Sequence, residues 1–314
     1  MHRWRSRLRD GFPLGKRFAF TILDDTDDAT VENVKPVYDL LYELGYRTTK
    51  TVWPVDCPEG SREYFAGHTL SNPGYLHFCL ELRARGFEIT WHGATMESST
   101  RDRTIKGLER FRDAFGHYPA LHVNHAQNRE NIYWGRDRYQ TGAIRFFAGL
   151  HKGDERYVGH VEGSPYFWGD LCLEHFRFTR NFTFYDINTL KADPHTPYRL
   201  DATPFVRRWF STSDGTNVDE FARVVHRGSI DRLHREGGVC ILSTHLAKGF
   251  VTDGRVDLRV ADALRYMSTL PGWFVPVSEV LDYLMMTAPT ESLSRPALAR
   301  LELRHAVDRF RGVR

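Results

Sequence analysis

Four carboxylates directly follow a short apolar run near the start of the chain. The run covers residues 18–23, and Asp24, Asp25, Asp27 and Asp28 come after it. Neighbouring side chains at a strand end point in different directions, so one of the first two carboxylates could bind a metal ion while the other stays free as a base. Two charges that close a buried strand are costly without a ligand or partner, which favours a functional site at Asp24 and Asp25. Asp27 and Asp28 are expected to open the following helix, because Asp is common at helix starts.

Three histidines follow later β-prone segments in the same way. They are His92 after residues 87–91, His125 after residues 120–124 and His245 after residues 239–244. In open α/β sheets and (β/α) barrels the carboxyl ends of the strands lie on one side, and that side carries the chemistry. We therefore expect these histidines to share a site with the carboxylates.

Helices and strands alternate around these residues with the spacing of βαβ units. Apolar residues between positions 34 and 44 recur at helical intervals, and Gly45 follows the last of them. Further on, we expect strands at 47–53, 87–91 and 120–124, and helices at 75–85 and 104–115. Regularity returns later with helices at 218–235 and 258–269, a strand at 239–244, a segment at 273–276 and a helix at 277–285. This alternation predicts an α/β fold with a parallel sheet.

Two regions depart from the alternation. Residues from about 127 to 214 are rich in aromatic residues, Gly and Pro and show no lasting periodicity, so we expect an irregular insertion there. The rings at 164–170 and 181–186 could wall a pocket for a ring-bearing substrate, or they could pack the insertion against the rest of the domain. The charged end after about residue 289 is expected to be a surface helix or a tail.

Composition limits the partners and the location. The 314 residues are 41% hydrophobic, which is enough for a large core in one domain spanning residues 1–314. The net charge is only +3, so we expect no nucleic-acid partner and a solvated N-terminal tail that contains Arg3, Arg5, Arg7 and Arg9. Without a signal-like start or a run of membrane-spanning length, we expect a cytoplasmic protein with no membrane partner. Four separated cysteines are expected to be reduced packing residues: Cys57, Cys79, Cys172 and Cys240.

The order of these motifs resembles the polysaccharide deacetylase (NodB-type) superfamily. The resemblance covers roughly residues 17–125 and 236–285. It implies a distorted (β/α) barrel with about seven parallel strands and metal-dependent removal of an N- or O-acyl group from a sugar. It also implies roles for four residues: Asp24 as general base, Asp25 and His92 as metal ligands, and His245 as general acid.

The chain departs from the family pattern at the metal site. Met96 stands where the family has its second histidine, and a thioether is a poor ligand for a divalent ion of this kind. The family's Arg-x-Pro motif is also absent, and residues 124–128 take its place. We expect His125 to supply the missing imidazole from the neighbouring strand, and Met96 to pack as an apolar wall. His122 and Glu97 are weaker candidates.

These features predict a metal-dependent hydrolase that removes an acetyl or formyl group from the nitrogen of a sugar. The expected ion is zinc, held by Asp25, His92 and His125, and the expected substrate is a small carbohydrate or a nucleotide-linked sugar. Substrate contacts are expected from Asn124, Trp91 and Trp168. Two alternatives stay open: a C–N hydrolase that acts on a small amide without metal, and an inactive barrel that binds carbohydrate.

Overall fold

Seven parallel strands close into a barrel, as the family resemblance implied. The computed structural model describes residues 8, 11–61, 66–151, 157–287 and 292–312; Arg3, Arg5, Arg7 and Arg9, which we expected in a solvated tail, lie outside them. The strands are β1 (Phe18–Asp24), β2 (Thr49–Val52), β3 (Glu88–Trp91), β4 (Leu121–His122), β5 (Phe178–Phe184), β6 (Trp209–Asp214) and β7 (Gly238–Thr244). Each pairs with the next, and β7 pairs back with β1 along the whole length of β1. The short strand β10 (Gly272–Trp273) pairs with the start of β1.

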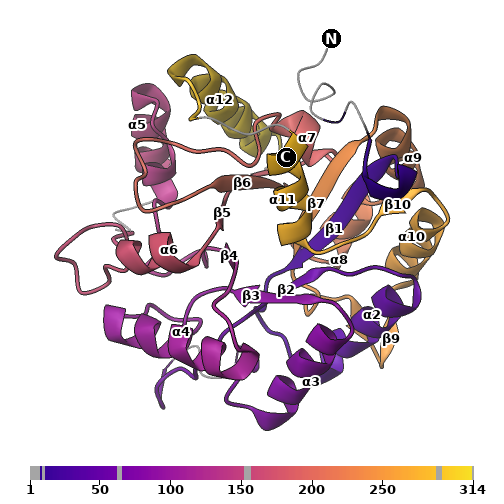
Figure 1. Ribbon diagram of the computed structural model, residues 1–314, viewed down its shortest axis with the longest axis horizontal. Coiled ribbons are helices and arrows are strands. Elements are labelled where there is room, and N and C mark those ends of the chain that lie inside the picture. The colour runs from indigo at the N-terminus through magenta and orange to yellow at the C-terminus, as the bar shows by residue number, and fades with distance from the viewer. Residues whose placement is uncertain (1–7, 9–10, 62–65, 152–156, 288–291, 313–314) are drawn as a thin grey trace.

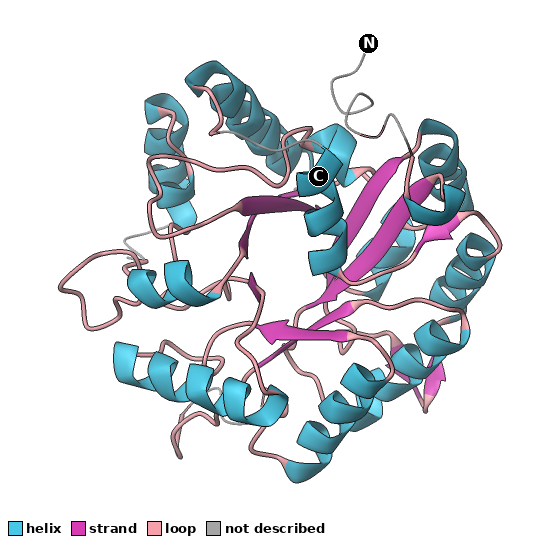
Figure 2. Ribbon diagram, viewed as in Figure 1, coloured by secondary structure: helices cyan, strands magenta, loops and turns pink. Residues whose placement is uncertain are grey.

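Helices surround the ring of strands (Figures 1 and 2). On one half of the ring these are α2 (Val31–Glu43), α3 (Pro73–Ala84), α4 (Arg101–Phe115), α8 (Val218–Val224), α9 (Arg227–Glu236) and α10 (Leu258–Ser268). On the other half are the 3-10 helix η2 (Gly135–Arg138), α5 (Gly142–His151), α6 (Gly169–His175), α7 (Thr189–Ala192) and α12 (Arg295–Gly312). The remaining elements are the 3-10 helix η1 (Pro13–Gly15), a hairpin of β8 (Val251–Thr252) and β9 (Arg255–Val256), and α11 (Val277–Thr287).

The side chains of β1 alternate between two cores. Phe18, Phe20 and Ile22 pack outward against the helices, whereas Ala19 and Leu23 belong to the cluster inside the barrel. This is the alternation of any strand with both faces buried. It also decides where the carboxylates at the end of the strand can point.

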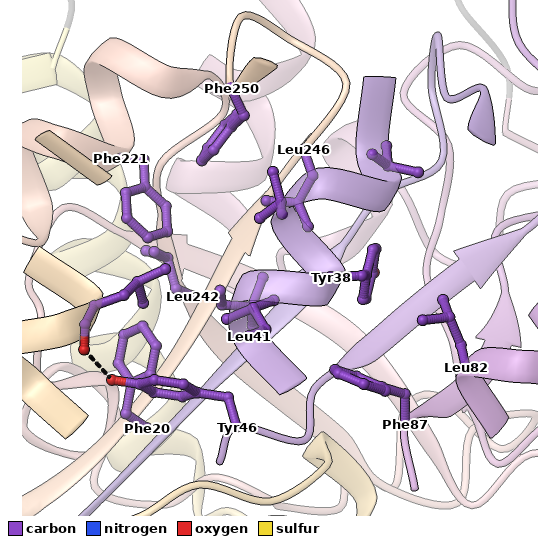
Figure 3. Close-up of a cluster of buried hydrophobic side chains, with 14 of the residues drawn as sticks. Phe20, Tyr38, Leu41, Tyr46, Leu82, Phe87, Phe221, Leu242, Leu246 and Phe250 are labelled. Atoms are coloured by element: carbon purple, nitrogen blue, oxygen red, sulfur yellow. Dashed lines mark hydrogen bonds between the residues drawn. The ribbon is translucent and has the colours of Figure 1, made fainter. Parts of the chain in front are cut away.

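The outer core joins the barrel to α2 and to the loops after β6 and β7 (Figure 3). In the close-up, Phe20 and Leu242 from neighbouring strands lie near Leu41 and Phe221 from the covering helices. The Tyr46 hydroxyl, buried in the same cluster, donates a hydrogen bond of 2.9 Å to the Leu264 carbonyl oxygen. The outer face of the barrel is therefore firmly packed, and free side chains must be sought at the ends of the strands.

Helix α2 (Val31–Glu43) is opened by Thr30, and not by Asp27 or Asp28. Thr30 is its N-cap, and the Thr30 side chain and the Asn33 side chain bond each other's backbone N–H groups in a capping box. The expectation that Asp27 or Asp28 opens this helix is therefore wrong. Both carboxylates lie in the turn before it and are available for another role.

Helix α11 closes the amino-terminal end of the barrel. Its apolar side chains join the interior cluster, and they are Val277, Val280, Leu281 and Leu284. The Val277 N–H donates to the Thr49 hydroxyl at the start of β2, and the Ser278 N–H donates to the Glu88 carboxylate at the start of β3. With this end filled, the carboxyl ends of the strands form the open side.

The middle and the end of the chain are more ordered than we expected. The stretch expected as an insertion, residues 127–214, contains two barrel strands, β5 and β6. The irregular part is the connection between β4 and β5, which carries η2, α5 and α6. The charged end forms α12, which contacts β5 and α5 and buries Leu301, Glu302 and His305.

All four cysteines are buried and unpaired: Cys57, Cys79, Cys172 and Cys240. They are therefore packing residues, as expected.

Within the part of the chain that the structure describes, none of the helices is both apolar enough and long enough to cross a membrane.

Candidate metal centre and active-site cavity

Three potential metal ligands converge at the open side of the barrel: Asp27, His92 and His125. Asp27 Oδ1 lies 3.3 Å from His92 Nε2 and 3.7 Å from His125 Nε2. The three residues follow β1, β3 and β4, so the barrel brings them together from three different loops. His92 and His125 are the two histidines expected here, but the carboxylate between them is Asp27, whereas we had expected Asp25.

A tight turn aims Asp27 back over the barrel. The Ala29 N–H donates to the Thr26 carbonyl oxygen, and Asp28 has a φ of 61°, in the left-handed region that Asp tolerates better than most residues. A second segment fixes this turn, because the Asp28 N–H donates to the Ala66 carbonyl oxygen. Gly67, with a φ of 134°, lies so close that a Cβ there would be 3.0 Å from the Ala29 nitrogen. This position requires glycine.

The His92 ring is oriented by the backbone. Its Nδ1 lies 3.1 Å from the Val123 carbonyl oxygen, which can only accept, so Nδ1 carries the proton. Nε2 therefore presents a lone pair to Asp27 when the ring is neutral. Burial lowers the pKa of His92 and outweighs the opposing effect of the carboxylates Asp25 and Asp27, which favours that neutral ring.

Asn128 orients His125 in a similar way. Its amide nitrogen donates to three oxygens: the Thr95 carbonyl at 3.4 Å, the Glu97 carbonyl at 3.1 Å and the Glu130 carboxylate at 3.0 Å. These partners leave only the amide oxygen of Asn128 to face His125 Nδ1, at 3.0 Å. His125 Nδ1 must therefore donate, and in the neutral ring Nε2 is left with a lone pair toward Asp27. Histidines that bind metals are commonly held in this manner through the other ring nitrogen.

The arrangement fits a divalent cation. Asp27 Oδ1 is buried and has no hydrogen-bond partner among the described residues, although two imidazole nitrogens point toward it. Lone pairs that face each other at this range repel unless a cation or a proton lies between them. One carboxylate and two imidazoles, with room for further ligands, is a donor set that catalytic zinc sites use.

Met96 lies beside this group as an apolar wall. It is buried in a small cluster with Trp53 and Cys57. Trp53 also contacts both histidine rings, stacked on His92 at 6.0 Å and edge-on to His125 at 5.8 Å between ring centroids. These contacts restrict the rings to the orientation that faces Asp27.

Asp25 is the carboxylate that points into the barrel mouth. It continues the inward row of Ala19 and Leu23, and its Oδ2 accepts a 2.8 Å hydrogen bond from Arg180, which also contacts the Ser243 hydroxyl. Its Oδ1 is buried and has no hydrogen-bond partner within the described ranges. Burial alone would raise the pKa of Asp25, but Arg180 and the nearby histidines hold it below the usual value. Asp25 is thus an ionised carboxylate with one oxygen free.

Asp24 points the other way, against the helices. It continues the outward row of Phe18, Phe20 and Ile22, and it is fully buried. Both of its oxygens are occupied, by three donors: the Tyr38 hydroxyl at 2.8 Å, Lys50 Nζ at 2.8 Å and the Leu246 N–H at 2.9 Å. The base role that we expected for Asp24 therefore lacks an available oxygen, whereas Asp25 offers one.

His245 lies on the opposite side of Asp27. Its Nδ1 is 2.8 Å from the Thr216 carbonyl oxygen, so this nitrogen donates, and Nε2 is 3.1 Å from Asp27 Oδ2. Burial would lower the pKa of His245, but the carboxylates of Asp27 and Asp25 outweigh it and raise the pKa. His245 faces the same mouth as Asp25, as expected of it.

Basic side chains surround the Asp27 carboxylate. Besides its three histidine neighbours, Lys248 Nζ lies 3.6 Å from Oδ2. Burial acts to raise the pKa of Asp27, but the three neighbouring histidines, His125, His245 and His92, hold it far below the usual value. Asp27 is therefore an ionised carboxylate at neutral pH.

Two cavities open on either side of this group. One of about 550 Å³ is lined by Asp25, Arg180 and His245, together with side chains from η2 and α12. The other, of about 500 Å³, is lined by Asp27, His125 and Met96. Two of the three candidate ligands, Asp27 and His125, thus line the smaller cavity, and their neighbours Asp25 and His245 line the larger one.

The three residues expected to contact substrate are buried in the core. Trp91 and Trp168 are each 1% exposed and belong to a cluster outside the barrel, and neither lines these cavities. The Asn124 side chain bonds the Ile132 backbone and accepts from His122 Nε2. These contacts indicate that Trp91 and Trp168 pack in the core and that Asn124 anchors the loop at Ile132.

The two weaker metal candidates are also engaged elsewhere. Burial lowers the pKa of His122 to about 3, and the ring packs edge-on against Trp168. Glu97 accepts hydrogen bonds from the Ser61 hydroxyl and from Arg103, both at 2.6 Å. His125 is the residue that the geometry brings to Asp27.

Two site residues were missed at the sequence level. Asp27 was assigned to a helix start, although its position two residues after Asp25 could have signalled a second inward carboxylate. Arg180 lies in the stretch that we read as an insertion, so nothing in its surroundings marked it as part of a barrel strand.

Comparisons with known proteins bear on the fold. No protein-family model matches the sequence, and no curated protein matches it. Among solved structures, Puue allantoinase is similar, with a TM-score of 0.53 and 13% identity over 88% of this chain and 93% of that chain. A probable polysaccharide deacetylase from Pseudomonas aeruginosa PAO1 is also similar, with a TM-score of 0.52 and 12% identity over 88% of this chain and 94% of the other. The expected fold, a distorted barrel of the polysaccharide deacetylase type, is thus confirmed.

Proposed function

We propose that this protein is a divergent member of the polysaccharide deacetylase superfamily and a metal-dependent hydrolase of C–N bonds. The observation that carries the proposal is the convergence of two oriented imidazole nitrogens on the unpartnered oxygen of Asp27. Asp27, His92 and His125 would hold the ion. Zinc is the proposed ion because one carboxylate and two imidazoles leave positions open for substrate and water. A divalent ion bound there would act as a Lewis acid on the substrate carbonyl and on the attacking water.

The other residues supply a base and an acid. Asp25, ionised and held by Arg180, accepts a proton from the attacking water on its free oxygen as the water oxygen bonds to the carbonyl carbon. His245, oriented by Thr216, donates its Nε2 proton to the nitrogen as the C–N bond breaks. The products are a carboxylic acid and an amine. Arg180 keeps the base oriented.

The proposed substrates are N-acylated sugars, including nucleotide-linked ones, and small cyclic or open amides. The similarity to a probable polysaccharide deacetylase supports the sugars, and the similarity to an allantoinase supports the small amides. The aromatic side chains of Trp134, Tyr139 and Tyr185 in the larger of the two cavities suit a ring-bearing substrate. We also propose a cytoplasmic location, which four buried and unpaired cysteines support.

Metal analysis tests the proposal. The full-length protein, purified and equilibrated with zinc, should retain about one ion per chain as a three-ligand site requires. His92→Ala and His125→Ala should each lose most of it, together with hydrolysis of N-acetyl and N-formyl sugars. His117→Ala is the matched control, because His117 is exposed and distant in the fold from the three ligands. Unchanged zinc content in both ligand variants would refute the proposed site.

A further inference from the structure

Three arginines from distant parts of the chain line the larger cavity. Arg138 comes from η2, Arg180 from β5 and Arg309 from α12. The same cavity is lined by Asp25 and His245, so the arginines lie beside the proposed reaction centre. The question is which negative charges balance them.

Two of the three arginines have carboxylate partners. Arg180 pairs with Asp25 and Arg309 pairs with Asp214, each at 2.8 Å. Arg138 has no carboxylate within ion-pair distance among the described residues. Its donors reach only the Asn181 backbone and side-chain oxygens. One positive charge in the cavity is therefore not compensated by the part of the chain that the structure describes.

Arg180, which also lines the cavity, has one unused donor. Arg180 is 7% exposed, and its Nε has no hydrogen-bond partner within the described part of the chain. A buried guanidinium N–H without a partner is costly, and a bound acceptor would remove that cost. The unpaired charge of Arg138 and the unpaired donor of Arg180 thus point to the same kind of ligand.

The cavity keeps its positive character at neutral pH. Burial and the neighbouring charges of Arg309 and Arg180 lower the pKa of Arg138 to about 10, at which it is still protonated in a neutral solution. His305, in the same wall, stays uncharged because burial and the two arginines Arg138 and Arg309 hold its pKa well below the usual value. Among the described residues, the carboxylates that line this cavity are Asp25 and Asp214.

The fold holds Arg138 in place before any ligand arrives. Its guanidinium lies 4.0 Å from the centre of the Trp134 ring. Helix α12 anchors the segment after η2, because the buried Glu302 accepts hydrogen bonds from the Gln140 and Thr141 N–H groups at 2.6 and 2.9 Å. A preorganised arginine loses little conformational entropy when it binds a planar or tetrahedral anion.

We propose that this cavity binds an anionic group of the substrate, a carboxylate or a phosphate, through Arg138. The inference rests on the proposed hydrolase function for the position of the scissile bond, but not for the anion site itself. Arginine forms paired hydrogen bonds with both groups, so the two sources share one recognition chemistry. The substrate would then be an acylated amino sugar or amide that also carries an acid group.

Ligand binding tests the anion site without any turnover. Inorganic phosphate and acetate are titrated separately into the full-length protein by isothermal calorimetry. Arg138→Gln should weaken the binding of the preferred anion roughly 10- to 100-fold, since one charge-assisted, paired contact is lost. Arg136→Gln, on the same short helix but exposed, should bind as the unaltered protein does. Equal affinity in Arg138→Gln and Arg136→Gln, or no binding of either anion, would overturn the inference.

Kinetics then separate the anion site from the proposed function. N-acetylglucosamine is compared with its 6-phosphate and with N-acetylmuramic acid, which carries a carboxylate. Arg138→Gln should raise KM for the preferred acidic substrate roughly 10-fold or more while kcat/KM for the neutral sugar changes less than about twofold. Equal effects on acidic and neutral sugars would contradict the inference. If no sugar is hydrolysed, the proposed function fails while calorimetry still decides the anion site.

A second substitution guards against a folding defect. Arg138→Lys keeps the positive charge but loses the planar fork, so it should bind the anion more weakly than arginine and more tightly than glutamine. Far-ultraviolet circular dichroism checks that each variant is folded. Identical anion affinity in the folded lysine and glutamine variants would show that charge at this position plays no part.

Discussion

The roles of two adjacent carboxylates are decided by the alternation of one strand. Asp24 follows the row of side chains that faces the helices, and Asp25 follows the row that faces the barrel interior. Asp24 is consequently paired with the Lys50 ammonium and hydrogen-bonded by the Tyr38 hydroxyl, whereas Asp25 keeps one oxygen free. A single-residue difference in position thus separates a structural ion pair from a candidate base.

Asparagine substitutions should separate the two carboxylates. Asp24→Asn leaves Lys50 buried without its counter-ion and should lower the free energy of unfolding by about 3–5 kcal/mol. Asp25→Asn should lower kcat for N-acyl hydrolysis roughly 10²- to 10⁴-fold, because the proton acceptor is lost. Urea unfolding and steady-state kinetics measure the two effects. A strongly unstable Asp25→Asn together with a stable, inactive Asp24→Asn would reverse the assignment.

Asn128 should control metal affinity without being a ligand. Its amide oxygen fixes the His125 ring, so Asn128→Ala should weaken zinc binding roughly 10- to 100-fold while some metal is still retained. Competition with a chromogenic chelator gives the affinity. Gln127→Ala is the control, because Gln127 is an exposed neighbour. Equal zinc affinity in both variants would show that His125 does not depend on this contact.

Met96 offers a test by restoration. It is buried beside Trp53, next to the two histidines, at the position where the family resemblance leads one to expect a second imidazole. In a His125→Ala background, Met96→His should recover part of the lost zinc, measured as ions per chain. Met96→Leu in the same background is the apolar control and should recover none. Equal zinc content in the two double variants would mean that position 96 cannot reach the ion.

Much of the candidate site could be predicted from the order of strands and polar residues. The placement of His92, His125 and His245 after β-prone segments predicted one shared mouth, and the structure brings all three within reach of Asp27. The Asp27 side chain could not be placed, because its direction depends on a turn fixed by a distant segment at Ala66 and Gly67. Long-range contacts of this kind leave no local pattern.

At the scale of elements, helix α12 is the least predictable feature. Its sequence is highly charged and its apolar residues do not form a regular stripe, which is typical of a surface helix. Yet it buries Glu302 and His305 against the connection between β4 and β5 and supplies Arg309 to the cavity. Its role depends on polar contacts, which hydrophobic periodicity does not reveal.

Loss of the Glu302 carboxylate should weaken the contact between α12 and the segment that follows η2. Glu302→Ala leaves the half-buried Gln140 and Thr141 N–H groups without their acceptor and should destabilise the contact by up to about 1–3 kcal/mol for each group. Compared with the unaltered protein, hydrogen exchange in Glu302→Ala should then be faster in η2 and α5 and unchanged in the barrel strands. Arg300→Ala, an exposed change on the same helix, is the control. Unchanged exchange in Glu302→Ala would show that α12 does not hold this segment.

At the scale of the whole molecule, the barrel could be predicted and the surroundings of its mouth could not. Alternating helices and strands predicted a parallel α/β sheet, and the family resemblance implied its closure into a barrel of about seven strands. The comparisons agree on the fold at 12–13% identity. Strands β5 and β6 were hidden because their residues are aromatic and polar, without the continuous apolar runs of β1 and β7. The cationic cavity depends on these same elements.

The central claim is that Asp27, and not Asp25, is the carboxylate that holds the ion. The direct measurement is the zinc content of Asp27→Asn and Asp25→Asn, purified alike and analysed by elemental mass spectrometry. Asp27→Asn should contain almost no zinc, because the carboxylate between His92 and His125 is gone, whereas Asp25→Asn should keep about one ion per chain. A full complement of zinc in Asp27→Asn together with its loss in Asp25→Asn would contradict the account.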